Sequence, residues 1–401
     1  MTTVNAALTS SLNTALNQSP SRGRINSIDM VRGLVMLMML LDHVRERVLL
    51  HLQVSDPMEI SNTDPGLFFS RLLAHWCAPV FVFLTGVSAY LYQQKGRALT
   101  PFLLKRGLVL ILLEMTLVNV AWLGSYNTLY LQVIWVIGLC MLLLALLHHL
   151  PRQLLLVLGC LLVAGHNLLT PLQFSPGESG YWLWTILHDR GFLLAPGEAA
   201  IAVKISYPLL PWVGVIVLGY LAGSWYQLPA GQRQRILWRA GWLALATLVL
   251  LRGLNLYGET LDWQIQPTAL LTLMDLLNFT KYPPSLDFLL LTLGLMCLAL
   301  RALERAAMTN PAARWQQVLA DFGAAPMFFY ILHLYALLLL YSLALLAFAP
   351  NQQTAYGPML GVSHVGWVWL IAVLLAVALY WPTRWFAGFK QRSQWRWVRY
   401  F

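Results

Sequence analysis

Charged residues are scarce in this chain. Asp, Glu, Lys and Arg together make up 10% of the 401 residues, whereas about 25% is usual for a soluble domain. Hydrophobic residues make up 59% and form long runs. This composition excludes an ordinary water-soluble protein. It predicts a polytopic α-helical membrane protein, because the strands of a membrane barrel give shorter, alternating patterns.

Cysteines and recognisable cofactor motifs are also few. The four cysteines, Cys77, Cys140, Cys160 and Cys297, stand in apolar runs without metal-ligand spacing, which predicts buried thiols and neither disulfides nor a metal site. No GxxxxGK[ST] or HExxH pattern occurs, so nothing points to ATP hydrolysis or a bound zinc. Residues 1–24 have no basic segment followed by an apolar run, and their composition predicts a disordered tail.

Apolar runs separated by proline, glycine or charge divide the chain into about ten candidate membrane-spanning helices. They lie near 26–47, 66–93, 101–123, 129–148, 153–170, 206–226, 238–256, 284–302, 323–348 and 364–383. Two long connections contain apolar stretches at 181–187 and 268–277, which predict short helices on the membrane surface. We therefore expect one all-α transmembrane domain over residues 25–401.

The distribution of basic residues orients these helices. If both termini are cytoplasmic, most lysines and arginines fall in cytoplasmic segments, such as Lys95-Gly96-Arg97, and acidic residues gather in outer segments. This arrangement satisfies the positive-inside rule. The net charge of +10 then reflects attraction to the anionic cytoplasmic leaflet, and nucleic acid is not needed to explain it.

Ten ionisable residues within the predicted helices are candidates for a functional role, because each costs at least about 2.5 kcal/mol to insert into the membrane. In the first helix, Arg32 and His43 share one face because eleven residues make about three turns, and Asp29 lies one turn from Arg32. This face predicts the wall of a polar channel between the cytoplasmic and outer surfaces. The alternative is a helix N-cap at Asn26 with Asp29 as its acidic partner, a snorkelling Arg32 and a solvated outer turn over residues 42–47. The other six of the ten ionisable residues are Arg71, His75, Glu114, Arg252, Asp287 and His333.

Three of these residues have competing interpretations. Glu114 requires a proton or a cationic partner, for which Arg71 and Arg252 are candidates. His333 stands among aromatic residues, which predicts a hydrogen-bonded core histidine. Asp287 follows Lys281-Tyr-Pro-Pro-Ser285, and it can cap a helix, bind substrate or pair with Lys281.

Several ordered segments resemble one superfamily. Asp29-x-x-Arg32-Gly33 followed by His43 resembles the first-helix motif of acyltransferase-3-type membrane acyltransferases. Segments 75–86 (HWCAPVFVFLTG), 207–214 (YPLLPWVG), 281–285 (KYPPS) and 327–333 (MFFYILH) are similar to bacterial relatives of heparan-α-glucosaminide N-acetyltransferase, in the same transmembrane acyltransferase superfamily. Together the segments span about residues 25–400.

The resemblance implies acetyl-CoA, or another acyl-CoA, as a cytoplasmic donor and a sugar amine or hydroxyl as acceptor on the outer face of a bacterial inner membrane. It places His43 at the point of acyl transfer, as general base or as covalent acyl carrier. It also puts Arg32 and Asp29 on the donor route, where Lys105 and Arg106 are expected to hold the nucleotide phosphates. No metal is expected, and a homo-oligomer is possible.

Other site assignments follow from the resemblance with alternatives open. Arg71 or His75 would stabilise the oxyanion of the reaction. In the lysosomal branch an asparagine tends to occupy the position of His43, and His51 is then the candidate for the essential histidine. Asp42 is a further catalytic candidate beside His43, but it points about 100° away on the helix, so it is not automatically the orienting partner. Lys281, Ser285, Asp287, Glu114 and His333 are possible supporting residues. A proton-coupled transporter is the competing function, because buried charges and proline-broken helices also occur there.

Overall fold

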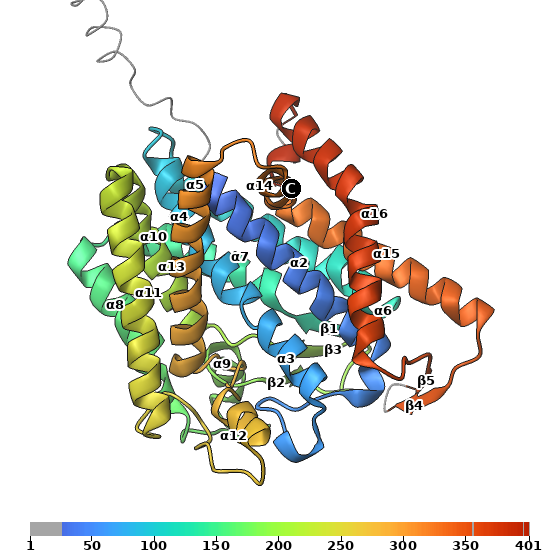
Figure 1. Cartoon of the computed structure of the whole chain (residues 1–401). Helices are drawn as coiled ribbons and strands as arrows, with labels where there is room; N and C mark the ends of the chain where they lie inside the picture. Colours follow the sequence, from blue (N-terminus) through green and yellow to red (C-terminus); the bar gives the residue numbers. More distant parts are fainter. Residues whose placement is uncertain (1–25, 355–356, 396, 401) are drawn as a thin grey trace, which may run out of the picture.

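The computed structural model describes residues 26–354, 357–395 and 397–400, and these residues are mostly helical (Figure 1). Five helical segments are long and apolar enough to cross a membrane: Pro65–Gln93, Ala230–Gly253, Leu286–Thr309, Pro326–Ala347 and Val365–Arg392. Val133–Leu147 and Arg152–Ala164 are apolar but shorter. The structure thus confirms a mainly helical chain and indicates an integral membrane protein. The predicted tail at residues 1–24 lies outside the described residues.

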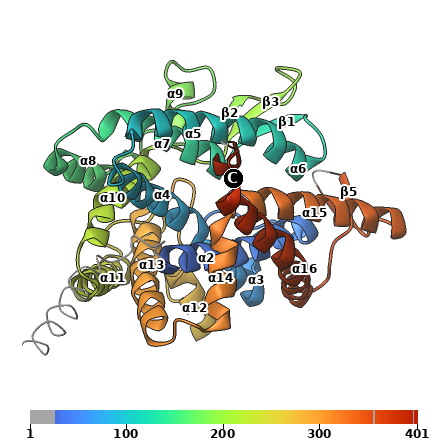
Figure 2. The same ribbon diagram turned by 90° about the horizontal axis from the view of Figure 1, so that it is seen from above.

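The helices of the bundle surround α2 (Asn26–Val48), which lies against α13, α14 and α15 (Figure 2). The others are α3 (Pro65–Ala74), α4 (Cys77–Gln93), α5 (Leu99–Leu113), α6 (Asn119–Leu123), α7 (Val133–Leu147), α8 (Arg152–Ala164), α10 (Leu210–Ala222), α11 (Ala230–Gly253), α13 (Leu286–Thr309), α14 (Arg314–Ala324), α15 (Pro326–Ala347) and α16 (Val365–Arg392). Short helices occur where the sequence predicts them in the two long connections: α9 (Tyr181–Leu187) and α12 (Ala269–Leu276).

Four predicted spans differ from single regular helices. The run 66–93 breaks between α3 and α4, and the run 101–123 passes through a π-helix at Glu114–Val118. The run 129–148 begins with strand β1 (Thr128–Leu131), and the run 153–170 ends its α-helix at Ala164. Helix α14 lies mainly in the predicted connection before the ninth span. The sequence does not predict it as a span because its polar and charged residues interrupt any long apolar run.

Short strands, which the sequence analysis did not predict, lie in the connections. β1 pairs in parallel with β3 (Ala202–Ile205), and β3 pairs antiparallel with β2 (Gly191–Leu194). A second pair joins β4 (Gln352–Thr354) to β5 (Gly357–Met359). Each strand has three or four residues, too few for an alternating pattern to stand out.

Glycines allow the tightest helix pairs to approach. On α2, Gly33 faces the backbone carbonyl of Leu319, and on α14, Gly323 faces the carbonyl of Asp29, so neither position has room for a methyl group. In a lipid environment such close packing supplies much of the attraction between helices. Facing glycines join α4 to α10, α5 to α7 and α11 to α13 in the same way: Gly86 and Gly219, Gly107 and Gly138, Gly241 and Gly294.

The connections gather at two ends of the bundle, called here the upper and lower ends as drawn in Figure 1. The α4–α5 and α13–α14 connections lie at the upper end, and α3, α12 and the β4–β5 hairpin lie at the lower end. Helix α2 begins at the upper end and descends, so Arg32 lies in its upper half and His43 close to its lower end.

Candidate active site

Two histidines from distant parts of the chain meet between α2 and α15. His43 Nδ1 lies 2.7 Å from His333 Nε2, and His333 Nδ1 lies 2.7 Å from the carbonyl oxygen of Phe329. Trp122 and Tyr330 pack edge-on against the His43 ring, at centroid distances of 4.8 and 5.8 Å. His333 is therefore the hydrogen-bonded core histidine that the sequence predicts, and it is also the direct partner of His43.

This chain of contacts assigns the tautomer of each ring. The Phe329 carbonyl can only accept a hydrogen bond, so His333 Nδ1 carries the hydrogen. In neutral His333 the lone pair then lies on Nε2, and His43 must donate to it from Nδ1. The lone pair of neutral His43 is consequently on Nε2. That nitrogen is the one that can take a proton or attack a carbonyl carbon.

Asp42 is engaged with a different residue. Its carboxylate lies 2.8 Å from the Arg45 guanidinium, which also lies 3.1 Å from Glu46. Asp42 is 9% exposed and Arg45 is 3% exposed. The alternative of a solvated outer turn is therefore wrong for these residues, and Asp42 orients Arg45 instead of His43.

Arg71 and Lys281 are linked through Asp56. The Asp56 carboxylate lies 3.2 Å from the Arg71 guanidinium and accepts hydrogen bonds from the backbone N–H groups of Lys281 and Tyr282, at 3.0 and 2.9 Å. The Lys281 ammonium is buried and lies 5.2 Å from the centre of the Tyr282 ring. These contacts fix the Lys281–Ser285 segment, through Asp56, to the last turn of α3.

His75 stands at the break between α3 and α4. It is 1% exposed, its ring lies 5.2 Å from that of Phe288, and neither ring nitrogen has a hydrogen-bond partner within the described part of the chain. The charges of Lys281, Arg71 and Asp42 act on it. We call Asp42, Arg45, Arg71, His75 and Lys281 the lower polar cluster, because they lie together at the lower end of α2, where Arg71 is half-buried and the others are buried.

The Glu114 carboxylate plays a structural part. It accepts hydrogen bonds from the backbone N–H groups of Ile134 and Trp135, at 3.0 and 3.2 Å, at the first turn of α7. Its Oε2 atom thus caps the first turn of α7, while Oε1 has no partner within the described ranges. The predicted pairing with Arg71 or Arg252 is wrong, because Arg71 pairs with Asp56 and Arg252 donates to backbone carbonyls, including that of Leu261.

Arg32 ties the upper half of α2 to α4. Its guanidinium lies 3.4 Å from Asp29, which confirms the predicted pair, and it donates to the Ser88 hydroxyl at 2.5 Å and to the Leu84 carbonyl at 3.3 Å. The side chain is 20% exposed, so it is held within the bundle and still accessible.

Five further candidate residues lie apart from the histidine pair. On α5, Lys105 is exposed and Arg106 lies 6.0 Å from the Phe102 ring. His51 lies in a short turn beside Gly361. Ser285 caps α13 by accepting from the Phe288 N–H at 3.0 Å. Asp287 does not pair with Lys281, since neither of its carboxylate oxygens has a partner among the described residues.

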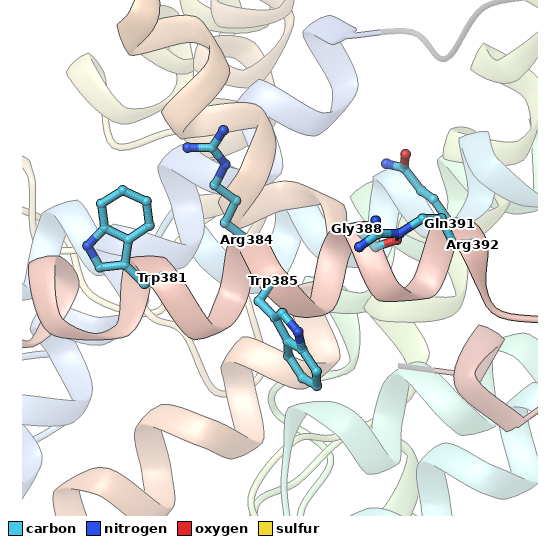
Figure 3. A pocket seen from close by; sticks show the side chains of 6 residues that line it. All are labelled: Trp381, Arg384, Trp385, Gly388, Gln391 and Arg392. Carbon is cyan, nitrogen blue, oxygen red and sulfur yellow. Dashed lines mark hydrogen bonds between the residues drawn. The ribbon is translucent and has the colours of Figure 1, made fainter.

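Two cavities lie apart from the His43–His333 pair, and neither histidine lines them. The larger, about 500 Å³, lies on α16 between Trp381 and Arg392 (Figure 3). Its helix segment contacts α14 near the upper end, opposite to His43. The smaller, about 180 Å³, is at the lower end and includes Asp287. Within the described ranges, no group of three His, Cys, Asp or Glu side chains is placed to hold a metal ion.

Residues 24–258 match the model of the family described as heparan-alpha-glucosaminide N-acetyltransferase, catalytic. The match covers more than half of the chain. The chain belongs to this family. Its members are membrane N-acetyltransferases that use acetyl-CoA as donor. The matched region contains Arg32, His43, Arg71 and His75, whereas His333 lies beyond it. No curated protein matches the chain.

Proposed function

We propose that the protein transfers an acetyl group from cytoplasmic acetyl-CoA to a sugar amine or hydroxyl on the outer side of a bacterial inner membrane. The observation that carries this proposal is the His43–His333 pair, which directs the one remaining lone pair of His43 to Nε2. Family membership supports acetyl transfer as the reaction. The basic connections at the upper end support a cytoplasmic position for that end.

In the direct mechanism, His43 Nε2 removes a proton from the acceptor as its nitrogen or oxygen attacks the thioester carbonyl. The carbon–sulfur bond then breaks, and the imidazolium returns the proton to the leaving CoA thiolate. General base catalysis of this kind contributes about 10²–10⁴-fold. His333 continues to accept from His43 Nδ1–H throughout, so it stabilises the imidazolium that forms.

A covalent route uses the same atom. His43 Nε2 attacks the thioester and CoA leaves as the thiolate; the acceptor then displaces the acetyl group from the imidazole, and the proton that the acceptor loses neutralises the CoA thiolate. In both routes a negative charge develops on the carbonyl oxygen. Arg71, His75 and Lys281 of the lower polar cluster are the groups that we assign to stabilise it.

The donor route is assigned to the upper half of α2. Arg32 and Asp29 would guide the pantetheine arm, and Lys105 and Arg106 would bind the nucleotide phosphates. This assignment requires about ten membrane crossings in a single domain over residues 25–401, with both termini cytoplasmic. A homo-oligomer is compatible with it.

The test uses purified protein in sealed vesicles, selected so that the upper end faces outward. Labelled acetyl-CoA is added outside, and glucosamine is enclosed. We expect N-acetylglucosamine inside with the wild type and none with His43→Ala. Label on the protein before acceptor is present, if it requires His43, supports the covalent route. Failure to bind acyl-CoA at millimolar concentration would overturn the proposal, and accumulation of unmodified label inside would favour the transporter alternative.

A further inference from the structure

A cavity of about 180 Å³ lies at the lower end of the bundle, where α11 ends and α13 begins. Its lining includes Asn167, Arg252, Tyr257, Glu259, Asp262 and Asp287. These residues come from three separate parts of the chain. The proposed acetyl transfer assigns no task to this cavity.

Asp287 is the unusual member of the lining. It is 0% exposed, and neither carboxylate oxygen has a hydrogen-bond partner within the described ranges. Its backbone N–H, in contrast, donates to the Gly258 carbonyl at 3.1 Å. A buried carboxylate without donors is costly, and buried polar groups in proteins are almost always paired. Two unpaired acceptor oxygens at a cavity therefore point to a ligand that donates hydrogen bonds.

The neighbouring polar groups are used differently. Glu259 accepts from the Thr280 hydroxyl and from the Ser285 hydroxyl, so it holds the Thr280–Ser285 segment in place. Asn167 accepts from the Leu286 N–H at 3.0 Å through its side-chain oxygen, which leaves its NH₂ group as a donor beside the cavity. Asp287 and Asn167 thus offer two acceptors and a donor.

The charges decide the class of ligand. Carboxylates at Asp262 and Asp287 disfavour an anion. Arg252 also lines the cavity, and its positive charge, held by backbone carbonyls such as that of Leu261, partly offsets the carboxylates of Asp287 and Glu259, which reduces the attraction for an organic cation. A metal ion lacks its ligands, since no three His, Cys, Asp or Glu side chains of the described part are close enough to share one. A neutral ligand rich in hydroxyl groups fits each of these conditions.

We propose that this cavity is a binding subsite for a neutral sugar, in which the two Asp287 oxygens accept hydrogen bonds from two adjacent hydroxyl groups. This proposal rests on the proposed function in one respect: the bound sugar is taken to be a unit of the glycan acceptor that does not itself react. The Thr280–Ser285 segment connects the cavity to the lower polar cluster, because Glu259 of the cavity binds Thr280 while Asp56 binds the backbone N–H of Lys281, a member of the cluster. A sugar in the cavity would therefore lie beside the segment that carries Lys281.

The experiment measures binding of methyl glucoside to purified protein in nanodiscs by calorimetry, without any acyl donor. Asp287→Asn replaces one acceptor oxygen by a donor and should weaken binding at least tenfold. Glu178→Gln makes the same charge change on an exposed residue of another lower-end loop and should bind like the wild type. Thermal unfolding of each variant checks that the fold is retained.

Probes of the wild type test the ligand class even where a variant fails to fold. A vicinal diol, trans-cyclohexane-1,2-diol, should bind more tightly than cyclohexanol, and choline should bind more weakly than methyl glucoside. Equal binding by Asp287→Asn and Glu178→Gln overturns the subsite, as does tighter binding of choline. His43→Ala should bind the glucoside normally. If the glucoside binds while the wild type transfers no acetyl group, the subsite stands and the proposed function fails. If the wild type transfers acetyl groups but does not bind the glucoside, the subsite alone fails.

Discussion

Replacing His333 by phenylalanine should slow acetyl transfer while leaving substrate binding nearly unchanged. The ring is fully buried, and phenylalanine keeps a planar ring of similar size in that space. The substitution removes the only acceptor that the described residues give to His43 Nδ1–H. His43 then loses the contact that fixes its tautomer, and Nε2 no longer reliably carries the lone pair.

The expected size follows from one lost hydrogen bond. Leaving a buried donor unsatisfied costs about 1–3 kcal/mol. The cost falls mainly on the transition state, because His43 gains positive charge there and needs the acceptor most. Since about 1.36 kcal/mol corresponds to a tenfold change in rate, kcat should fall about 5- to 150-fold. KM for acetyl-CoA should stay within about twofold of the wild type.

Steady-state turnover of purified His333→Phe and His333→Gln provides the assay. The glutamine amide oxygen can accept from His43 Nδ1–H, so His333→Gln should retain more of the wild-type kcat than His333→Phe. Thermal unfolding confirms that both variants are folded. A folded His333→Phe with wild-type kcat, or a glutamine variant as slow as the phenylalanine variant, would refute the reasoning from the hydrogen-bond chain.

Three further substitutions test the packing, the ion pair and the donor route. Gly33→Leu should lower the thermal unfolding temperature, because its side chain meets the backbone of α14, and overpacking costs about 1–3 kcal/mol or more; Gly231→Leu, with nothing within 4 Å, should not. Arg71→Gln should cost about 3–5 kcal/mol by leaving Asp56 buried without its counter-charge, and adding Asp56→Asn should restore part of the lost thermal stability. Arg32→Gln should raise KM for acetyl-CoA in steady-state kinetics with kcat within about tenfold of the wild type; a fall in kcat alone would contradict a role in donor binding.

Helical periodicity was sufficient for the parts of the site that lie within α2. The helix spans Asn26–Val48, close to the predicted 26–47, and Arg32 pairs with Asp29 as expected. These relations depend on neighbours three or four residues apart, which sequence spacing determines directly. The separation of Arg32 from His43 along the helix follows from the same geometry.

Helical spacing in the sequence does not predict contacts between distant segments. His43 and His333 are 290 positions apart, and no local pattern shows which helices lie side by side. The Glu114 partners were missed because its hydrogen bonds go to backbone N–H groups of α7, which have no side-chain signature. Helix α14 was missed because it packs through Gly323 against α2 and carries no long apolar run.

Turnover of acetyl-CoA with glucosamine by purified His43→Ala and His51→Ala tests the central claim most directly. The two histidines are the competing candidates for the transfer point, and both belong to the region that matches the family. We predict that His43→Ala loses at least about 10²-fold in kcat and that His51→Ala stays close to the wild type. Full turnover by a folded His43→Ala, or its loss in His51→Ala alone, would contradict the assignment of His43 as the residue that transfers the acetyl group.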